Sequence, residues 1–419
     1  MLRCWGCSGR TATVRERPRR DCNTLLGNDS RPCHPELKDN VVLPEAVALR
    51  CPVAQQPGTL IIVIIDVHCH MGLSQRRATP LPGRFSFEPH GSSGREGYDA
   101  YMSQRVLGSV LWSYIKRKLG IDRALIQGPQ LDVALLETCE RHLLGASDID
   151  RFVLLAFDEY HDDSGRPVGP ISSAQPVGSD MYTSNSFIKM LCMNHPDRYL
   201  FGASVHPYRP KAIEALEEVV QGGAVLIKWL PVHQNIDARD PRVERFVRRA
   251  GELHLPLLIH YGTESFLRAN HRPFENPIPM FDLLEKIRTD GSIPPVIIAH
   301  VAAPTLPCQK GKHYRATTSA LVDRFPDDPV YADISALAHK PRCLKDLLRR
   351  RKLHGKLVYG SDFPIPPATM WFPLHLWGKR RELLAHPSWA QQNYSIMKAL
   401  GVPEEIFNRG YDILQEKIA

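Results

Sequence analysis

The chain has 419 residues, of which 43% are hydrophobic and 23% are charged, and this composition is ordinary for a globular enzyme. Lysine and arginine exceed aspartate and glutamate by 53 to 45, but the net charge of +8 is spread along the chain without a nucleic-acid-binding motif, so we expect no nucleic-acid partner. No run approaches the roughly 18 apolar residues that a membrane span needs, so we expect no membrane partner.

Residues 1–57 are rich in arginine, proline and cysteine and have no hydrophobic periodicity. Cys4 and Cys7 are spaced as in a zinc knuckle, but the later cysteines fit none of the usual zinc frames. We therefore expect an irregular or disordered extension, followed by one folded domain over 58–419. The five cysteines beyond residue 51 are scattered, as buried thiols of a reducing compartment are, so we expect a cytoplasmic protein.

The first predicted strand ends in two histidines. Five consecutive β-branched residues, 61–65, indicate a strand that is buried on both faces. Side chains alternate along a strand, so Asp66, His68 and His70 are expected on one face. Two imidazoles at the end of a buried strand can converge on one metal ion. The alternative for each histidine is a polar residue that is hydrogen-bonded at a strand end.

Strands and helices then alternate to the end of the chain. Seven further strands are predicted at 152–157, 199–206, 224–230, 255–260, 295–300, 330–334 and 356–360. Helices are predicted at 98–119, 130–144, 184–194, 210–221, 241–253, 278–289, 314–325, 341–351, 388–400 and 403–417. Eight strands in this alternation predict a (β/α)8 TIM barrel, and an open doubly wound α/β sheet is the alternative.

Two βα loops, at 73–97 and 158–180, are unusually long and rich in glycine and proline. Both leave the ends of strands at which the active site of a barrel lies. We expect these loops to cover the pocket and to set its specificity.

Chemically versatile side chains collect at these strand ends. They are His68 and His70 after the first strand, His206 after the third, Lys228 and Trp229 in the fourth, His260 after the fifth, His300 after the sixth and Asp362 after the eighth. Five of the 18 histidines thus fall at one rim. A site of neutral imidazoles and one carboxylate suits Zn²⁺, with Mn²⁺ and Fe²⁺ as alternatives.

Several short segments resemble the amidohydrolase superfamily, in particular its amidohydrolase-related branch of hydrolases, lactonases, a hydratase and non-oxidative decarboxylases. They are DVHCH at 66–70, LIH at 258–260, IAH at 298–300, YADIS at 331–335 and YGSDFP at 359–364. The resemblance extends from about residue 60 to about residue 415 and keeps the chain order. It implies that His68, His70 and His260 are imidazole ligands of the metal.

The resemblance also implies that Asp362 is a carboxylate ligand and the proton acceptor for a metal-bound water. His300 would help to hold the metal or would polarise the substrate. In some members a lysine at the position of Lys228 is carboxylated and bridges two metals. The alternative is an ammonium group that pairs with Asp362 or binds a substrate carboxylate, and we predict this alternative, with a single divalent metal.

Three further residues are candidates for substrate contact. His206 and Glu264 lie just past the third and fifth strands, and an ordinary loop position is the alternative for each. Trp229 could line the pocket, although an aromatic residue at such a position is more often part of the core.

These observations predict a metal-dependent hydrolase in which metal-bound hydroxide attacks the carbonyl of a small amide, ester or lactone. One alternative is a non-oxidative decarboxylase of a carboxylated aromatic or unsaturated acid, with Asp362 protonating the carbon. Another is a catalytically dead barrel that only binds a ligand. The partner is then a small-molecule substrate, and a homodimer is expected because related barrels often form dimers.

Overall fold

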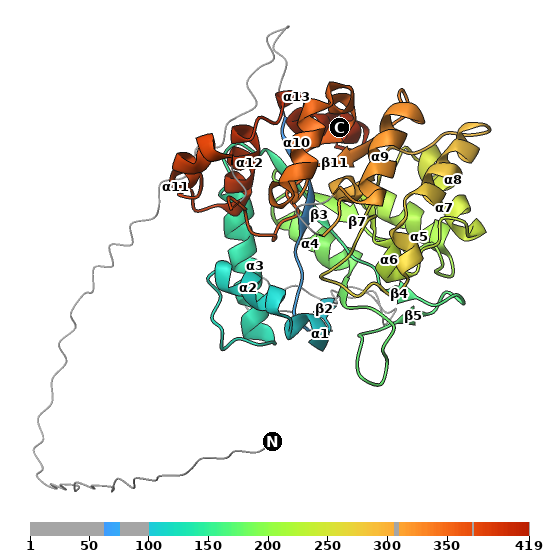
Figure 1. Ribbon diagram of the computed structural model, residues 1–419. Helices are drawn as coiled ribbons and strands as arrows, with labels where there is room; N and C mark the ends of the chain where they lie inside the picture. Colours follow the sequence, from blue (N-terminus) through green and yellow to red (C-terminus); the bar gives the residue numbers. More distant parts are fainter. Residues whose placement is uncertain (1–62, 76–99, 306–309, 371–372, 419) are drawn as a thin grey trace, which may run out of the picture. The chain divides into compact units, whose positions relative to one another are not determined.

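The computed structural model describes residues 63–75, 100–305, 310–370 and 373–418 (Figure 1). The predictions for residues 1–57, and for most of the loop at 73–97, lie outside the described residues. In the described part of the chain, no helix is long and apolar enough to cross a membrane. Four cysteines there, Cys69, Cys139, Cys192 and Cys343, are buried free thiols.

One parallel sheet of eight strands forms the centre of the fold, and each strand pairs with the next one along the chain. The strands are β1 (Ile65–His70), β3 (Arg151–Leu155), β7 (Tyr199–Ala203), β8 (Ala224–Trp229), β9 (Leu257–Ile259), β10 (Val296–Ile298), β11 (Val330–Asp333) and β12 (Leu357–Val358). All eight predicted strands are therefore confirmed, although most of them are shorter than predicted.

The last strand closes onto the first. The backbone N–H of Val67 donates to the carbonyl of Tyr359 at 3.3 Å, and the N–H of Asp362 donates to the carbonyl of His68 at 2.9 Å. The sheet is consequently a closed barrel, and the alternative of an open doubly wound sheet is wrong. The (β/α)8 prediction is confirmed.

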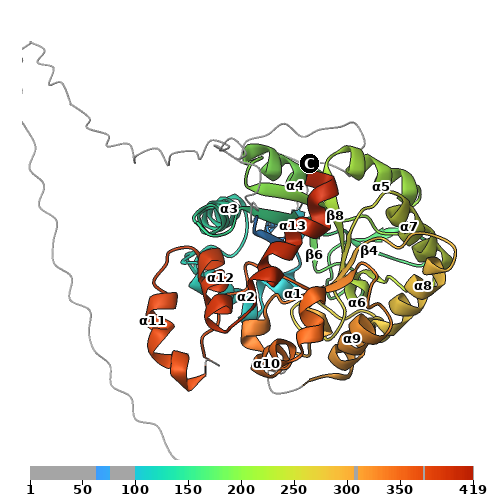
Figure 2. The ribbon, with the colours of Figure 1, turned by 90° about the horizontal axis from the view of Figure 1, so that it is seen from above.

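Helices surround the strands (Figure 2). The longer ones are α3 (Pro129–Leu144), α4 (Asn185–Asn194), α5 (Ala212–Gln221), α7 (Pro241–Glu252), α8 (Ile278–Arg288), α9 (Lys312–Asp323), α10 (Pro341–Arg349), α12 (Trp389–Ala399) and α13 (Glu404–Ile418). Each matches a predicted helix to within about two residues. Short turns of helix lie between them: α6 (Pro231–Gln234), η2 (Arg272–Glu275), η3 (Ala299–Ala302), η4 (Leu337–His339), η5 (Arg351–Lys356), η6 (Leu374–Lys379) and α11 (Arg380–Leu383).

The single helix predicted over 98–119 is wrong. This part of the chain forms β2 (Ala100–Met102), α1 (Gln104–Leu107) and α2 (Val110–Lys118). The hydroxyl of Ser103 accepts from the N–H of Val106, and the hydroxyl of Ser109 accepts from the N–H of Trp112. Each serine therefore starts a new helix, because a side-chain cap of this kind replaces the preceding helical turn.

Helix α13 closes one end of the barrel. Its Leu414 packs into the barrel interior with Ile65 and Val67 from the beginning of β1. A side chain at Gly410 would come within 2.9 Å of the carbonyl of Ile65, so this glycine permits the close approach. Figure 2 shows α13 lying across this end, so the open end of the barrel is the opposite one, where the carboxyl ends of the strands lie.

The long segment predicted as a loop at 158–180 is partly regular. Strands β4 (Tyr160–His161) and β5 (Pro167–Val168) form an antiparallel pair, and β6 (Met181–Thr183) pairs with β2. Both pairs belong to the connections that leave the carboxyl ends of the barrel strands. Their role in covering a pocket stays a prediction.

A buried carboxylate joins these connections. Asp180 is fully buried, and it accepts hydrogen bonds from the Ser103 hydroxyl at 2.5 Å, the Arg105 guanidinium and the N–H of Arg268 at 2.6 Å. Its own N–H donates to Nε2 of His233 at 3.0 Å. Burial alone would raise the pKa of Asp180, but hydrogen bonds from Arg105 and Ser103 outweigh it and lower that pKa.

Replacing this carboxylate should destabilise the fold. We expect Asp180→Ala to reduce the free energy of unfolding by about 3 kcal/mol at pH 7, because several buried donors lose their acceptor. The pKa of Asp180 is lower in the folded state than the unfolded value of about 3.9. The contribution of Asp180 to the free energy of unfolding is therefore complete above that pH and is lost as the pH falls below it. Urea unfolding at pH 7 and near pH 3 tests this. Asp327→Ala, which removes an exposed carboxylate, is the control.

Candidate metal centre

The end of β1 brings two imidazoles to the open end of the barrel. The pairing of β1 with β3 shifts register between Asp66 and Cys69. Beyond the shift, the Nε2 atoms of His68 and His70 lie 3.2 Å apart. Asp66 instead accepts hydrogen bonds from the N–H groups of His68 (3.1 Å) and Ser361 (2.9 Å). The prediction that Asp66 shares its face with both histidines is wrong, because such an irregularity breaks the alternation of side chains.

Asp362 completes a tight group with these two histidines. Its Oδ1 atom is 3.6 Å from Nε2 of His68 and 3.6 Å from Nε2 of His70. Its Oδ2 atom is 3.6 Å from Nε2 of His300. The structure thus brings together three of the four predicted metal ligands with His300, which was predicted to help to hold the metal or to polarise the substrate.

His300 and Asp362 both have backbone conformations that side chains rarely adopt. Their φ angles are 43° and 60°, and the β-branched Val301 has a φ of 53°. Such residues typically cost about 1–3 kcal/mol each and persist where surrounding contacts impose them. For His300 the contact is the hydrogen bond from its N–H to Asp333, and for Asp362 it is the bond from its N–H to the carbonyl of His68.

Asp333, the last residue of β11, orients the imidazole of His68 and holds the backbone of His300. Its Oδ2 accepts from Nδ1 of His68 at 2.8 Å, and its Oδ1 accepts from the N–H of His300 at 2.7 Å. The first bond leaves Nε2 of His68 as the unprotonated nitrogen, which is the tautomer that a metal ligand needs. Our sequence reasoning assigned no role to Asp333, although its place at the end of a buried strand was a usable signal.

His260 lies on the far side of His300. Their ring centroids are 4.5 Å apart, while the Nε2 atom of His260 is 3.4 Å from Oε2 of Glu264. The other oxygen of Glu264 accepts from three successive backbone N–H groups, at residues 265–267. Glu264 is therefore fixed beside the cluster. The ring of His260 contacts the cluster at the ring of His300, rather than at His68 or His70.

Lys228 lies inside the cluster. Its Nζ atom is 3.0 Å from Nε2 of His68, and the residue is only 2% exposed. Burial lowers the pKa of Lys228, and the carboxylates of Asp362, Asp333 and Glu264 partly oppose that shift.

Two residues predicted to contact substrate point elsewhere. Trp229 is fully buried against Phe246 of α7, and its indole N–H donates to the carbonyl of Val205 at 2.8 Å. His206 is also fully buried, and its two ring nitrogens bond the carbonyl of Gln234 and a backbone N–H. As placed here, neither side chain reaches the metal centre.

The donor set fits a divalent metal. Burial lowers the pKa of His68, His70, His260 and His300 well below the ordinary value, so all four rings are neutral and can donate lone pairs. Ligand atoms about 2.1 Å from a tetrahedral Zn²⁺ lie about 3.4 Å apart, and the 3.2 Å and 3.6 Å separations within the group agree with this.

The cluster is also open to solvent. In the described part of the chain, His68, His300 and Asp362 each place one ligand atom within 4.8 Å of the others. The side chains of His70 and Asp362 are 21% and 18% exposed. A ligand arriving at the open end of the barrel can therefore reach them.

The glycine before Ser361 makes room for the first histidine. A side chain at Gly360 would come within 2.9 Å of Cβ of His68. We expect Gly360→Ala to cost about 1–3 kcal/mol of stability through overpacking and to weaken metal binding, because His68 must move. Gly355→Ala, which would meet nothing within 4 Å, is the matched control. Equal zinc affinity in the two variants, measured by competition with a chelator, would contradict the prediction.

Comparison with known proteins identifies the family. The amidohydrolase family model matches residues 157–394, which is more than half of the chain. The chain belongs to the amidohydrolase family. Members of this family are mostly enzymes, and they typically depend on a metal. The resemblance expected from the short strand-end segments is therefore confirmed. No curated protein matches the chain.

Solved structures are similar to this chain, and one of them, a TIM-barrel protein, supports the barrel fold. An uncharacterised TIM-barrel protein from Bordetella bronchiseptica aligns with a TM-score of 0.52 at 12% identity, covering 85% of this chain and 99% of that chain. A probable 2-pyrone-4,6-dicarboxylic acid hydrolase from Acinetobacter baumannii has a TM-score of 0.43 at 15% identity, with 84% and 99% covered. A 4-oxalomesaconate hydratase from Rhodopseudomonas palustris has a TM-score of 0.44 at 14% identity, with 84% and 96% covered.

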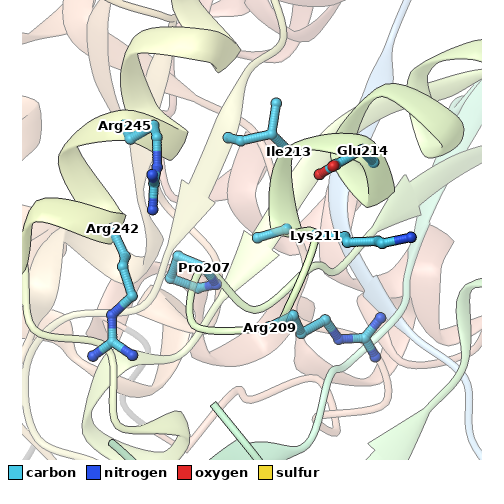
Figure 3. Close-up of a pocket in the computed structure, with 8 residues that line it drawn as sticks. Pro207, Arg209, Lys211, Ile213, Glu214, Arg242 and Arg245 are labelled. Carbon is cyan, nitrogen blue, oxygen red and sulfur yellow. The ribbon is translucent and has the colours of Figure 1, made fainter. Parts of the chain in front are cut away.

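A separate cavity of about 390 Å³ lies at the rim of this amidohydrolase barrel, between residues 207–214 and the start of α7 (Figure 3). Several cations line it, but Arg209 is paired with Asp158 and Arg242 with Asp240. None of its lining residues belongs to the histidine cluster, so this cavity is distinct from the candidate metal centre.

Proposed function

We propose that this amidohydrolase is a metal-dependent hydrolase of a small amide, ester or lactone. The observation that supports the proposal most is the convergence of His68, His70 and Asp362, whose ligand atoms lie 3.2–3.6 Å apart at the open end of the barrel. These three residues, with His300 and His260 beside them, would hold one divalent metal, with zinc as our first choice. Such a metal supplies Lewis acidity and lowers the pKa of a bound water to about 7.

Asp362 is the proposed proton carrier. Burial raises its pKa, while Lys228 acts against the shift, so its carboxylate is a stronger base than an ordinary aspartate. It would take a proton from the attacking water and deliver it to the leaving group, which a carboxyl with a raised pKa can do near neutral pH.

His300 is the proposed polarising group. Its Nε2 atom lies on the Oδ2 side of Asp362, whereas His68 and His70 lie on the Oδ1 side. A substrate carbonyl bound between His300 and the metal ligands would have the ring of His300 on one side, either as a hydrogen-bond donor or as a ligand nitrogen. Asp362, the proton carrier, would lie on its other side. Lys228 stays an ammonium group beside His68 in this proposal and is not a carboxylated bridge between two metals.

Turnover of a substrate panel in ¹⁸O-labelled water tests the reaction class. A hydrolase incorporates one labelled oxygen into the product of a lactone, ester or amide. Release of CO₂ from a carboxylated aromatic or unsaturated acid, without label, would instead select a decarboxylase in which Asp362 protonates the carbon. Specific binding of panel compounds without turnover would favour a barrel that only binds its ligand.

A further inference from the structure

The amine of Lys228 faces the atom through which His68 would bind the metal. Its Nζ atom lies 3.0 Å from Nε2 of His68. That Nε2 atom is itself 3.2 Å from Nε2 of His70 and 3.6 Å from Oδ1 of Asp362, so it belongs to the tightest part of the centre. The amine of Lys228 is therefore in direct contact with a proposed ligand atom.

The other side of the imidazole fixes the direction of this contact. Nδ1 of His68 lies 2.8 Å from Oδ2 of Asp333, and a carboxylate oxygen accepts, so Nδ1 carries the ring proton. A neutral imidazole then has one lone pair in the ring plane, on Nε2. The amine of Lys228 consequently donates an N–H to that lone pair, and it has such a donor whether or not it is charged.

One lone pair cannot serve two bonds. An imidazole that binds a metal gives its lone pair to the ion, whereas an imidazole that accepts a hydrogen bond gives the same lone pair to the donor. The hydrogen bond from Lys228 and a bond from Nε2 of His68 to a metal therefore exclude each other. Any ion that binds at His68 must displace the amine.

The fold keeps Lys228 close to His68 but allows its amine to move. Lys228 lies in β8, where it pairs with Leu258 of β9 and its carbonyl accepts from the hydroxyl of Ser204 at 2.8 Å. The backbone of Lys228 is thus fixed at one place in the barrel wall. The amine stands at the end of a flexible four-carbon chain, so it can give way without a movement of the strand.

We propose that Lys228 competes with the metal for the lone pair of His68 and thereby sets the metal affinity of the centre. The inference rests on the metal centre of the proposed function, but not on the reaction that this centre catalyses. A lysine in this role lowers the affinity for the ion, whereas a carboxylated lysine would raise it by supplying ligand oxygens. The two roles therefore predict changes of opposite sign when the side chain is replaced.

Charge repulsion alone is the competing explanation. An ammonium group near a divalent ion weakens the binding of that ion, whichever ligand the ammonium group touches. The two explanations differ in their dependence on His68. Competition for a lone pair disappears when His68 is removed, whereas repulsion by a nearby charge persists. A double-mutant cycle between Lys228 and His68 separates them.

The test measures the Zn²⁺ affinity of the full-length protein by competition with a chelator. We expect Lys228→Met to bind Zn²⁺ about tenfold more tightly than the wild type, or better, because one hydrogen bond of a charged group no longer has to be broken. Lys228→Leu, which likewise has no N–H donor, should show the same gain. In a His68→Ala background, which binds Zn²⁺ more weakly, Lys228→Met should change the affinity by less than about twofold.

The matched control is Lys356→Met. It removes another buried lysine, whose Nζ donates to the carbonyl of Asp328 at 2.7 Å, and it should leave the Zn²⁺ affinity unchanged. Circular dichroism checks the fold of each variant.

Three outcomes would overturn the inference: an unchanged Zn²⁺ affinity in Lys228→Met, a weaker affinity as expected for the loss of a carboxylated ligand, or an equal gain in both His68 backgrounds. None of these measurements requires turnover. A failed hydrolase assay with an intact gain in Zn²⁺ affinity would therefore reject the proposed reaction and keep the competition at His68.

Discussion

A His68→Ala/His70→Ala variant is expected to retain less than a tenth of the divalent metal that the wild type binds. The two Nε2 atoms lie 3.2 Å apart, and both lie 3.6 Å from Asp362, so the variant loses two of the three donors in the tightest part of the site. The variant keeps Asp362 and His300, with His260 beside His300, but it loses the pair of nitrogens closest to each other, and zinc sites need three or four protein donors that converge on one point. Elemental analysis of protein purified without chelators measures the loss.

The control for this experiment is His254→Ala, which removes an exposed imidazole and should leave the metal content unchanged. About one equivalent in the wild type agrees with a mononuclear centre. Two equivalents would instead make Lys228 a carboxylated ligand and correct our prediction of a single metal. Equal metal content in the wild type and in the double variant would contradict the assignment of His68 and His70.

The barrel was predictable because its signals are local and repeated. Each strand is a short apolar run flanked by polar turns, and each long helix has an apolar face, so element type follows from periodicity. The error at 98–119 arose where two serines interrupt a helical pattern. A hydroxyl that caps a new helix and a hydroxyl that lies on a helix surface look alike in one sequence.

The centre was predictable only in part. The strand ends placed His68, His70, His300 and Asp362 at one rim, and the distances between their atoms agree with that prediction. Alternation within β8 was in fact sufficient to show that Trp229, next to the inward Lys228, points outward. His206 lies three residues past the end of β7, where alternation no longer holds and only tertiary contacts fix the ring.

Some features required the three-dimensional structure. The register shift in β1 turns Asp66 away from the histidines, and no residue type marks it in the sequence. The left-handed conformations of His300 and Asp362 are likewise unusual for their residue types, and they are imposed by hydrogen bonds from distant segments.

An Asp362→Asn variant is expected to lose about two to four orders of magnitude in kcat on the substrate that the panel identifies, since general acid–base catalysis contributes about that much. Asparagine has nearly the shape of aspartate but cannot accept the proton. Because burial raises the pKa of Asp362, the wild-type rate should also rise with pH above the ordinary carboxyl value of about 4, as the base form appears. In the variant, only a rise from the ionisation of the metal-bound water, whose pKa is about 7, should remain.

Loss of metal would also reduce turnover, so the metal must be controlled. We would measure kcat at saturating Zn²⁺, confirm the bound metal in each sample, and compare Asp327→Asn, in which an exposed carboxylate is neutralised. A metal-loaded Asp362→Asn protein with more than a tenth of the wild-type kcat would remove Asp362 from proton transfer and leave it a ligand only. A metal-loaded variant with the full loss of kcat would support its role as the proton carrier, because its metal content shows that the metal is still held.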